Sequence, residues 1–530
     1  MGKKKPAASA IAKMLHADAT GTGGASIKSL TLGPAIQAKK ATYAVTCETL
    51  RMLPVIQQLV SEAGLLEQDP RLSQETAFVL CYEVLFGEGL RQKGPAERLV
   101  LSAQPALEQQ LAAMLAEAGV AHARDLVKES AQSAAAQRRP RSARVNTLKM
   151  SVAEALSWLR TPKEKQPAKL AQLGKQVSAD ELLPDVLLFP AATDLHDHPL
   201  VKSSCLILQS KASCMPAHAL APEPGWDVLD ACAAPGNKTT HLAALMQGEG
   251  SVLAFDKDPR RLQCLKANAA ATGAHCIRAR VADFLQLPLA TSPEFRNVKG
   301  ALVDPSCSGS GTTLSRMDFL LPSHAAQLSL GPASGRTAES KSAGSGMQQS
   351  RAAEESNDTP GCAEQQANLG SVNLAEHEGH ISREEREVLG SAEAPGDETA
   401  HRAESGEHDG EHLAGRGDSG KRSEVDRVER LARFQEAAVR HALTLPALQR
   451  LVYSTCSVHE RENEAVVAAV LPYTRELGFE LVDPFPRWHR RGLAGSVEGA
   501  EKLVRTHAVE DGTDGFFLAV FQRGPESSEP

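Results

Sequence analysis

The sequence predicts an α/β protein whose largest domain is a mostly parallel, doubly wound sheet. From Asp227 onward, short apolar or β-branched runs alternate with stretches of helical periodicity, which is the pattern of βαβ units. Several of these runs end in small or acidic residues, as expected where an open α/β sheet binds a ligand at the carboxyl ends of its strands. Residues 42–119 instead have apolar side chains at helical spacing, so a helical region precedes the sheet.

The candidate core strands are the segments 227–234, 251–256, 300–307 and 449–456. A further strand is expected to end near Asp283, and residues 515–523 (GFFLAVFQR) are expected to form a late edge strand. The helix after the first strand should begin near Lys238, behind the tight turn at Pro235-Gly236. The carboxyl ends of the parallel strands would then meet at one rim of the sheet.

The 530 residues divide into five regions. We expect the following organisation: a disordered tail (1–25), a helical N-terminal domain (26–135), a lead-in region (136–205), an α/β domain in two pieces (206–330 and 426–525) and a disordered insert (331–425). The insert has no Phe, Tyr or Trp and carries 9 basic and 19 acidic side chains, so it cannot bury enough apolar surface to offset its ordering entropy. The rest of the chain has a net charge of +3, against −7 for the whole, which allows a nucleic-acid partner.

Composition excludes several classes of protein. The ten cysteines form no Cys-x-x-Cys pair, which argues against a disulfide scaffold and against zinc-finger ligation and favours a reducing compartment. No stretch of about 18 uncharged apolar residues is present, so we expect no membrane span. No group of residues has the spacing of metal ligands, and we expect no metal.

Acidic residues at successive strand ends predict a cofactor that contains a nucleoside. The segment 230–240 (DACAAPGNKTT) is a strand, a tight turn and a helix start, and it is neither GxGxxG nor GxxxxGKS. Asp256 follows 26 residues after Asp230, about one βαβ unit, and a carboxylate there can accept hydrogen bonds from both ribose hydroxyls. Asp283 would lie near an adenine. Each aspartate taken alone is better explained as a helix cap, and the three at successive strand ends together favour such a cofactor.

Two cysteines are predicted to meet at the same rim. Cys307 follows the fourth strand in DPSCSGSG (304–311), and Cys456 follows the fifth strand in STCS (454–457). A lone cysteine at a strand end is usually a small buried apolar residue. A pair beside Asp304 favours nucleophilic chemistry, with a helix after Cys456 lowering its pKa; a redox switch is the alternative interpretation.

In six ordered motifs the sequence resembles the Nop2/Sun-domain RNA cytosine-5 methyltransferases, which use S-adenosylmethionine (SAM). The motifs are DACAAPGNKT (230–239), FDKD (255–258), VADF (281–284), DPSCSGSG (304–311), YSTCSVHERENEAVV (453–467) and DGFFLAVF (514–521). Family members commonly have Asp-Ala-Pro-Cys where this chain has Asp-Pro-Ser-Cys, and that variant is similar to the branch acting on large-subunit ribosomal RNA. The resemblance implies a class I, Rossmann-like, SAM-dependent catalytic domain that follows an RNA-recognition region.

The resemblance also implies a role for each site residue. Cys456 would add to C6 of the cytosine, Cys307 would help to release the product, and Asp304 would hydrogen-bond the base. The residues implied to bind SAM are Ala233, Ala234, Pro235, Gly236, Asn237, Lys238, Asp256, Asp283 and Asp304. Whether Lys238 contacts SAM or the base stays open. The runs 138–149 and 487–491 (RWHRR) are candidate RNA contacts, the second because it places an aromatic ring among basic residues; a half-buried Trp488 with solvated flanks is the alternative.

The expected partner is large-subunit ribosomal RNA, within or outside pre-ribosomal particles. We expect a monomer in the nucleus and nucleolus. Two other functions compete with this one: a ribosome-assembly factor that binds RNA without catalysis, and a methyltransferase for an exocyclic nitrogen. Both cysteines and the strand-end aspartates weigh against the first, and the absence of an Asn/Asp-Pro-Pro-aromatic motif weighs against the second.

Overall fold

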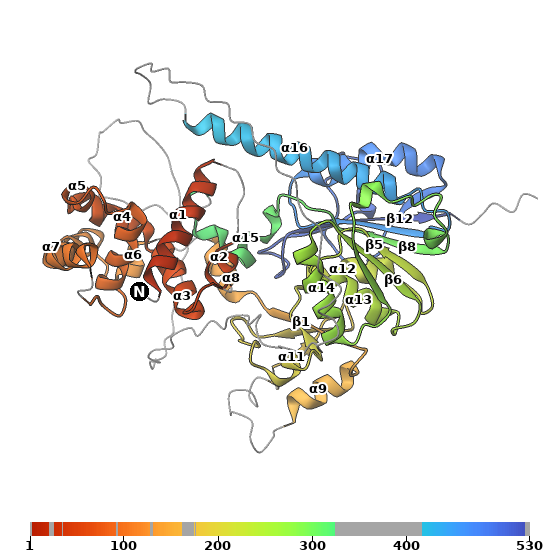
Figure 1. The fold of residues 1–530 in the computed structure, drawn as a ribbon, viewed down its shortest axis with the longest axis horizontal. Helices are drawn as coiled ribbons and strands as arrows, with labels where there is room; N and C mark the ends of the chain where they lie inside the picture. Colours follow the sequence, from red (N-terminus) through yellow and green to blue (C-terminus); the bar gives the residue numbers. More distant parts are fainter. Residues whose placement is uncertain are drawn as a thin grey trace, which may run out of the picture.

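The computed structural model describes residues 3–20, 26–33, 35–91, 94–127, 131–161, 174, 176–323 and 416–524. Figure 1 shows a group of N-terminal helices, a small sheet around β1 and a larger α/β domain. The larger domain confirms the predicted α/β architecture with a mostly parallel sheet. None of the described helices is long and apolar enough to cross a membrane.

The N-terminal domain is helical. Its helices share one apolar core, which is centred on residues such as Leu50, Ile56 and Phe78. The helices are α1 (Lys4–Thr20), α2 (Ile27–Thr31), α3 (Lys39–Arg51), α4 (Leu53–Glu62), α5 (Leu65–Gln68), α6 (Gln74–Leu85), α7 (Pro95–Ala118) and α8 (Ala131–Arg138).

The expectation of a disordered tail at 1–25 is wrong for most of that segment. Helix α1 packs on α3 and α6, and it buries Ala7, Ile11 and Met14, which follow the i, i+4, i+7 spacing of one helix face. Residues 21–25 lie outside the described residues. The Ala-rich composition concealed this face, because alanine contributes little hydrophobicity even where it is fully buried.

A small antiparallel sheet follows, with the strand order β2-β3-β1-β4. Its strands are β1 (Arg141–Val145), β2 (Ser178–Ala179), β3 (Val186–Phe189) and β4 (Leu206–Ile207), with helices α9 (Val152–Arg160) and α11 (Pro199–Lys202) between them. Because β4 pairs with β1, this region extends past the boundary expected at residue 205.

Buried polar contacts join the small sheet to the larger domain. Arg144 of β1 donates to Thr240. The two carboxylate oxygens of Asp185 lie 2.7 Å from His218 Nε2 and 2.8 Å from His241 Nε2. Burial and the charge of Arg144 lower the pKa of His241 to about 3, so its ring is neutral at pH 7.

The large sheet has the order β10-β12-β9-β8-β5-β6-β7, with β11 paired to β12. The neighbours from β9 to β7 are parallel, whereas β10, β11 and β12 run antiparallel to their partners. The strands are β5 (Asp227–Asp230), β6 (Ser251–Asp256), β7 (Ile277–Val281), β8 (Val298–Val303), β9 (Arg450–Thr455), β10 (Phe479–Val482), β11 (Val504–Thr506) and β12 (Phe516–Arg523).

Strand β12 is not the edge strand that was expected. It pairs with β9 on one side and with β10 and β11 on the other, and residues 516–521 are all buried. The continuous apolar run FFLAVF is therefore that of a strand covered on both faces.

Helices cover both faces of the large sheet. Helices α12 (Lys211–Leu220) and α13 (Asn237–Leu245) share one apolar core with the strands, and α14 (Pro259–Thr272) packs along β6 and β7. Helices α16 (Arg416–Ala442) and α17 (Glu464–Glu476) share a second core. Figure 1 shows α16 running from the N-terminal helices to the sheet.

The expected insert differs from the structure at one end. Residues 331–415 lie outside the described residues, but residues 416–425 form the first turns of α16. On the other side of the insert, α15 (Thr313–Arg316) and the turn after it pack into the N-terminal core through Leu314 and Phe319. The segment that follows Cys307 is thus held by the N-terminal domain.

Candidate active site

The carboxyl ends of four neighbouring parallel strands carry most of the predicted site residues. Asp230 ends β5, Asp256 ends β6, Asp304 follows β8 and Cys456 follows β9. Because these strands lie side by side in the order β9-β8-β5-β6, residues far apart in the sequence share one rim. Asp283 follows β7 at the outer end of the same rim.

The two cysteines meet as predicted. Cys307 Sγ lies 3.2 Å from Cys456 Sγ. The hydrogen bond with Cys307 lowers the pKa of Cys456, although burial and the Asp304 carboxylate oppose this, and the Lys238 ammonium also lowers it. The same hydrogen bond, together with burial and the charge of Glu462, raises the pKa of Cys307 well above its usual value. The pair therefore favours a thiolate on Cys456 and a thiol on Cys307.

The expected cause of thiolate formation is corrected. A helix was predicted directly after Cys456, but α17 begins only at Glu464, and residues 460–462 form a single 3₁₀ turn. The effect of a helix N-terminus fades within about one turn. The hydrogen bond from Cys307 takes its place.

Asp304 and Lys238 form an ion pair beside the thiols. Lys238 Nζ lies 2.8 Å from Asp304 Oδ2, and Ser454 Oγ donates to Asp304 Oδ1 over 2.6 Å. Burial lowers the pKa of Lys238, but the Asp304 carboxylate more than compensates, so the pKa is raised above its ordinary value. Lys238 also lies 5.4 Å from the centre of the Phe516 ring. These contacts place a fixed cation and a carboxylate at the carboxyl ends of the parallel strands.

The turn at 233–238 is tied to neighbouring elements on several sides. Ala233 N donates to the carbonyl of Phe255 over 2.8 Å, and Ala234 N donates to Asp256 Oδ2 over 3.2 Å. Asn268 of α14 donates to the carbonyl of Pro235. Gly236 has φ +104°, a left-handed conformation that strains any other residue. Small residues in this turn let a ligand approach the backbone closely.

The residues at this rim fit a SAM nucleoside. The two oxygens of Asp256 accept from Ala234 N and from Asp258 N over 2.9 Å, and each oxygen retains a lone pair for a ribose hydroxyl. A surface hollow lined by residues 257–260 opens beside it. Asp283 is exposed and caps the next turn by accepting from Leu285 N, so one of its oxygens stays available to a ligand.

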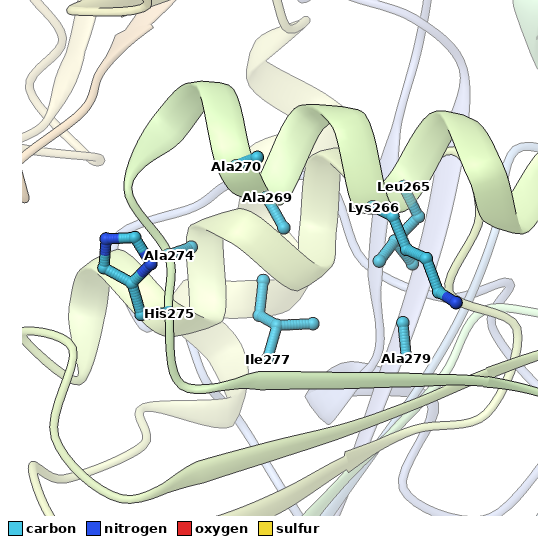
Figure 2. Close-up of a pocket in the computed structure, with 8 residues that line it drawn as sticks. All are labelled: Leu265, Lys266, Ala269, Ala270, Ala274, His275, Ile277 and Ala279. Carbon is cyan, nitrogen blue, oxygen red and sulfur yellow. The ribbon is translucent and has the colours of Figure 1, made fainter. Parts of the chain in front are cut away.

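A second pocket has no part in this site. Figure 2 shows it between α14 and β7, lined by Leu265, Ala269, Ile277 and other mainly apolar residues. None of the predicted site residues lines it, and Lys266 and His275 are the polar residues among its mainly apolar walls.

Neither basic run is a simple phosphate-binding patch. In the first run, Arg139 donates to Asp514 over 2.8 Å and Arg144 is fully buried, whereas Arg138 and Arg141 are exposed. In the second run, Trp488 is buried and donates to the carbonyl of Arg505. The stacking surface expected from RWHRR is therefore absent from this structure.

Arg490 and Arg491 also have partners within the protein. They form ion pairs with Asp511 and Asp483. Because these carboxylates are 21 and 8 residues away in the sequence, the motif alone gave no sign of the pairing.

Several site residues were missed by the sequence analysis. Ser454 bonds Asp304, and the buried residues Gln435, Glu462 and Asn463 surround the two cysteine turns. Ser454, Glu462 and Asn463 lie inside the motif 453–467, but Cys456 was the one residue of that motif to which a role was assigned. Gln435 gave no signal, because it lies in a helix that borders the insert.

Three family models match the chain. They are described as 16S rRNA methyltransferase RsmB/F (residues 217–323), NOL1/NOP2/Sun domain family member 5, N-terminal domain (40–127), and the ferredoxin-like domain of the same family member (139–209). The solved structure of PH0851 has a TM-score of 0.53 at 17% identity, covering 95% of this chain and 99% of that one, and supports the fold alone.

Curated relatives match over nearly the whole chain. The 25S rRNA (cytosine-C(5))-methyltransferase NSUN5 of Arabidopsis thaliana is 35% identical over 99% of this chain and 74% of its own length. The 28S rRNA (cytosine-C(5))-methyltransferase of Mus musculus is 34% identical over 94% of this chain and 87% of its own length. The chain therefore belongs to the NOL1/NOP2/Sun domain member 5 (NSUN5) family of SAM-dependent methyltransferases.

Proposed function

We propose that this enzyme methylates C5 of a cytosine in large-subunit ribosomal RNA through a covalent adduct between cysteine and base. The substrate is supported by the relatives in plant and mouse, which are named as 25S and 28S rRNA methyltransferases. The mechanism is carried by one observation, the 3.2 Å contact between Cys307 and Cys456 beside Asp304 and Lys238.

Cys456 is the nucleophile. Cytosine C5 is a poor nucleophile, and a thiolate that adds to C6 turns the ring into an enamine-like species that can attack a methyl group. SAM, when bound, supplies that methyl group on its sulfonium. The base must leave the RNA stack to reach the rim of the sheet. Lys238 and Cys307 favour the Cys456 thiolate before the base arrives.

Asp304 selects and holds the base. Its carboxylate accepts hydrogen bonds, so it can accept one from the N4 amino group of cytosine, a donor that uracil lacks. The adjacent Lys238 ammonium lies where negative charge develops on the ring during the addition. Through this ion pair, Lys238 acts on both the base and the nucleophile.

Cys307 acts in product release. After methyl transfer, C5 bears both the methyl group and a proton, and the proton passes to water. The electron pair of the C5–H bond forms the C5–C6 double bond, and the C6–S bond breaks with its pair returning to Cys456. The Cys307 thiol, 3.2 Å from Cys456 Sγ, donates a hydrogen bond that stabilises the departing thiolate.

The cofactor would lie against the turn after β5. Backbone groups of Ala233, Ala234, Pro235, Gly236 and Asn237 would face it, Asp256 would accept the ribose hydroxyls and Asp283 would contact the adenine. Asp304 and Lys238, which form an ion pair, would complete the set of residues around the cofactor.

The exposed residues Arg138 and Arg141, which lie at the end of α8 and at the start of β1, would contact RNA phosphates. A ribosomal RNA substrate places the enzyme in the nucleus and nucleolus, acting as a monomer on pre-ribosomal particles. Co-sedimentation with such particles and sedimentation equilibrium of the free protein test these two points.

The decisive experiment uses the Cys307→Ala variant. Expressed in cells and recovered under denaturing conditions, it should carry RNA covalently bound at one cytosine, and the Cys307→Ala/Cys456→Ala double variant should not. If no adduct forms while the wild-type protein methylates RNA, the cysteine roles are wrong. If the wild type binds ribosomal RNA without methylating it, the assembly-factor function replaces this proposal.

A further inference from the structure

Three consecutive buried polar residues follow the Cys456 turn. Glu462, Asn463 and Glu464 are each fully inaccessible to solvent. Burying such groups is costly unless each is satisfied, and Glu462 and Asn463 each contact one of the two cysteine turns. Glu464 is paired with Arg505, so its charge is neutralised, whereas none of the described cations pairs with Glu462.

Glu462 contacts the turn that carries Cys307. Its Oε1 accepts from Ser308 N over 2.9 Å, and its Oε2 accepts from Ser308 Oγ over 2.5 Å. Gln435 of α16 donates to the same Oε1 over 3.0 Å and also to the carbonyl of Ser306. Glu462 and Gln435, which contact each other, thus fix the residues on both sides of Cys307.

Asn463 contacts the turn that carries Cys456. Thr455 Oγ1 donates to Asn463 Oδ1 over 2.5 Å, and Asn463 Nδ2 donates to the carbonyl of Ser457 over 3.0 Å. Since Glu462 and Asn463 are adjacent, one backbone segment fixes the positions of both thiols relative to each other.

The charge of Glu462 has a second consequence. The hydrogen bond with Cys456 and burial raise the pKa of Cys307, and the charge of Glu462 adds to this, because a buried carboxylate disfavours a further negative charge nearby. The hydrogen bond with Cys307 and the Lys238 cation lower the pKa of Cys456, whereas burial and the Asp304 carboxylate oppose this. The charge of Glu462 therefore acts in the same direction as the hydrogen bond between the two thiols, and both keep the proton on Cys307.

We propose that Glu462 is a positioning residue for Cys307: its carboxylate fixes Ser308, and its charge keeps the proton of the thiol pair on Cys307. The inference rests on the proposed function, in which Cys307 must be the hydrogen-bond donor to the departing thiolate. Without the carboxylate, the proton is shared more evenly between the thiols, and the C6–S bond breaks more slowly.

The test compares Glu462→Gln, which removes the charge while keeping the shape, with Glu460→Gln, which changes an exposed neighbour. The first readout needs no RNA: iodoacetamide labelling of Cys307 is followed against pH by peptide mass spectrometry. Labelling reports the thiolate, so its midpoint should move to lower pH in Glu462→Gln and stay unchanged in Glu460→Gln. A purely structural role of Glu462 would not produce this shift.

The second readout is the covalent adduct formed with SAM and an unmodified transcript of the large-subunit RNA. Product release should slow about tenfold in Glu462→Gln, the effect of one weakened hydrogen bond to a charged group, so that adduct accumulates as in Cys307→Ala. If Cys307→Ala accumulates adduct but Glu462→Gln does not, the inference fails while the proposed function stands. If Cys307→Ala accumulates none, the proposed function fails, and labelling alone decides the effect of Glu462 on the thiol.

A third variant guards against misfolding. Glu462→Asp keeps the charge but withdraws it by one methylene group, so it should give a smaller labelling shift in the same direction. If Glu462→Gln does not fold, the labelling experiment is done with Glu462→Asp instead. A Cys307 midpoint that is unchanged in the folded variant overturns the proposal.

Discussion

Asp230 makes the stability of the catalytic domain depend on pH. It ends β5 and is almost fully buried. Burial raises its pKa to about 7, from an ordinary value of 3.8, and the nearby Asp304 adds to this; the hydrogen bond from Thr239 and the charge of Lys238 only partly offset it. Because the pKa is raised in the folded state, its stabilising contribution is complete below pH 3.8 and is lost as the pH rises through about 7.

The size of the effect follows from the shift. Three pKa units correspond to about 4 kcal/mol in total, and roughly 2 to 3 kcal/mol of this is lost between pH 5 and pH 8. The Asp230→Asn variant cannot titrate and keeps an acceptor for Thr239. The free energy of unfolding of Asp230→Asn minus that of the wild type should therefore be larger at pH 8 than at pH 5 by that amount.

Urea unfolding of the full chain, followed by tryptophan fluorescence at both pH values, measures this difference. Asp227→Asn is the matched control, because it removes a carboxylate from the start of the same strand, where the side chain is only half-buried. If the pH dependence of Asp230→Asn equals that of the wild type, the assignment of the buried proton to Asp230 is refuted.

Three further predictions concern other sites. Lys238→Met removes the cation beside Cys456 and should raise the pKa of that thiol, so iodoacetamide labelling of Cys456 at pH 7 should slow; unchanged labelling would exclude this electrostatic role. Phe319→Ala empties a position in the N-terminal core and should cost about 3 to 5 kcal/mol of that domain's stability, seen as an earlier transition in calorimetry. Trp488→Phe loses the bond to Arg505 and should lower the free energy of unfolding by about 1 kcal/mol without changing RNA affinity; a large loss of affinity in a filter-binding assay would restore the stacking hypothesis.

The fold of the catalytic domain was predictable because its signals are local. Each parallel strand is a short apolar run that ends in an acidic or small residue, and topology then brings those ends to one rim. The predictions that β12 is an edge strand and that α1 is disordered were wrong because they also rested on local signals alone. Whether an apolar run lies at an edge, and whether an Ala-rich stretch is covered, depends on partners that are distant in the sequence.

The candidate site was predictable where its residues lie within recognisable sequence motifs. The thiol pair, Asp304 and the turn at 233–238 were placed correctly at the rim by strand order. What the sequence could not supply was pairing between distant side chains, such as Arg139 with Asp514. The same limit hid Asp185, His218 and His241, whose ligand atoms lie within 4.8 Å of one another, a cluster that could hold a metal ion although its spacing resembles no metal motif.

The insert can be tested as a separate unit, because the active site depends on α16 only beyond the insert's expected end. The first buried residue described on α16 is Val428, and Val425 is exposed; Gln435, which contacts Glu462, lies further along the helix. Deleting residues 331–425 therefore removes none of these contacts, and shortening a long connection changes its closure entropy only logarithmically. SAM affinity measured by calorimetry should be unchanged. A large loss of affinity would show that the insert, or the first turns of α16, supports the cofactor site directly.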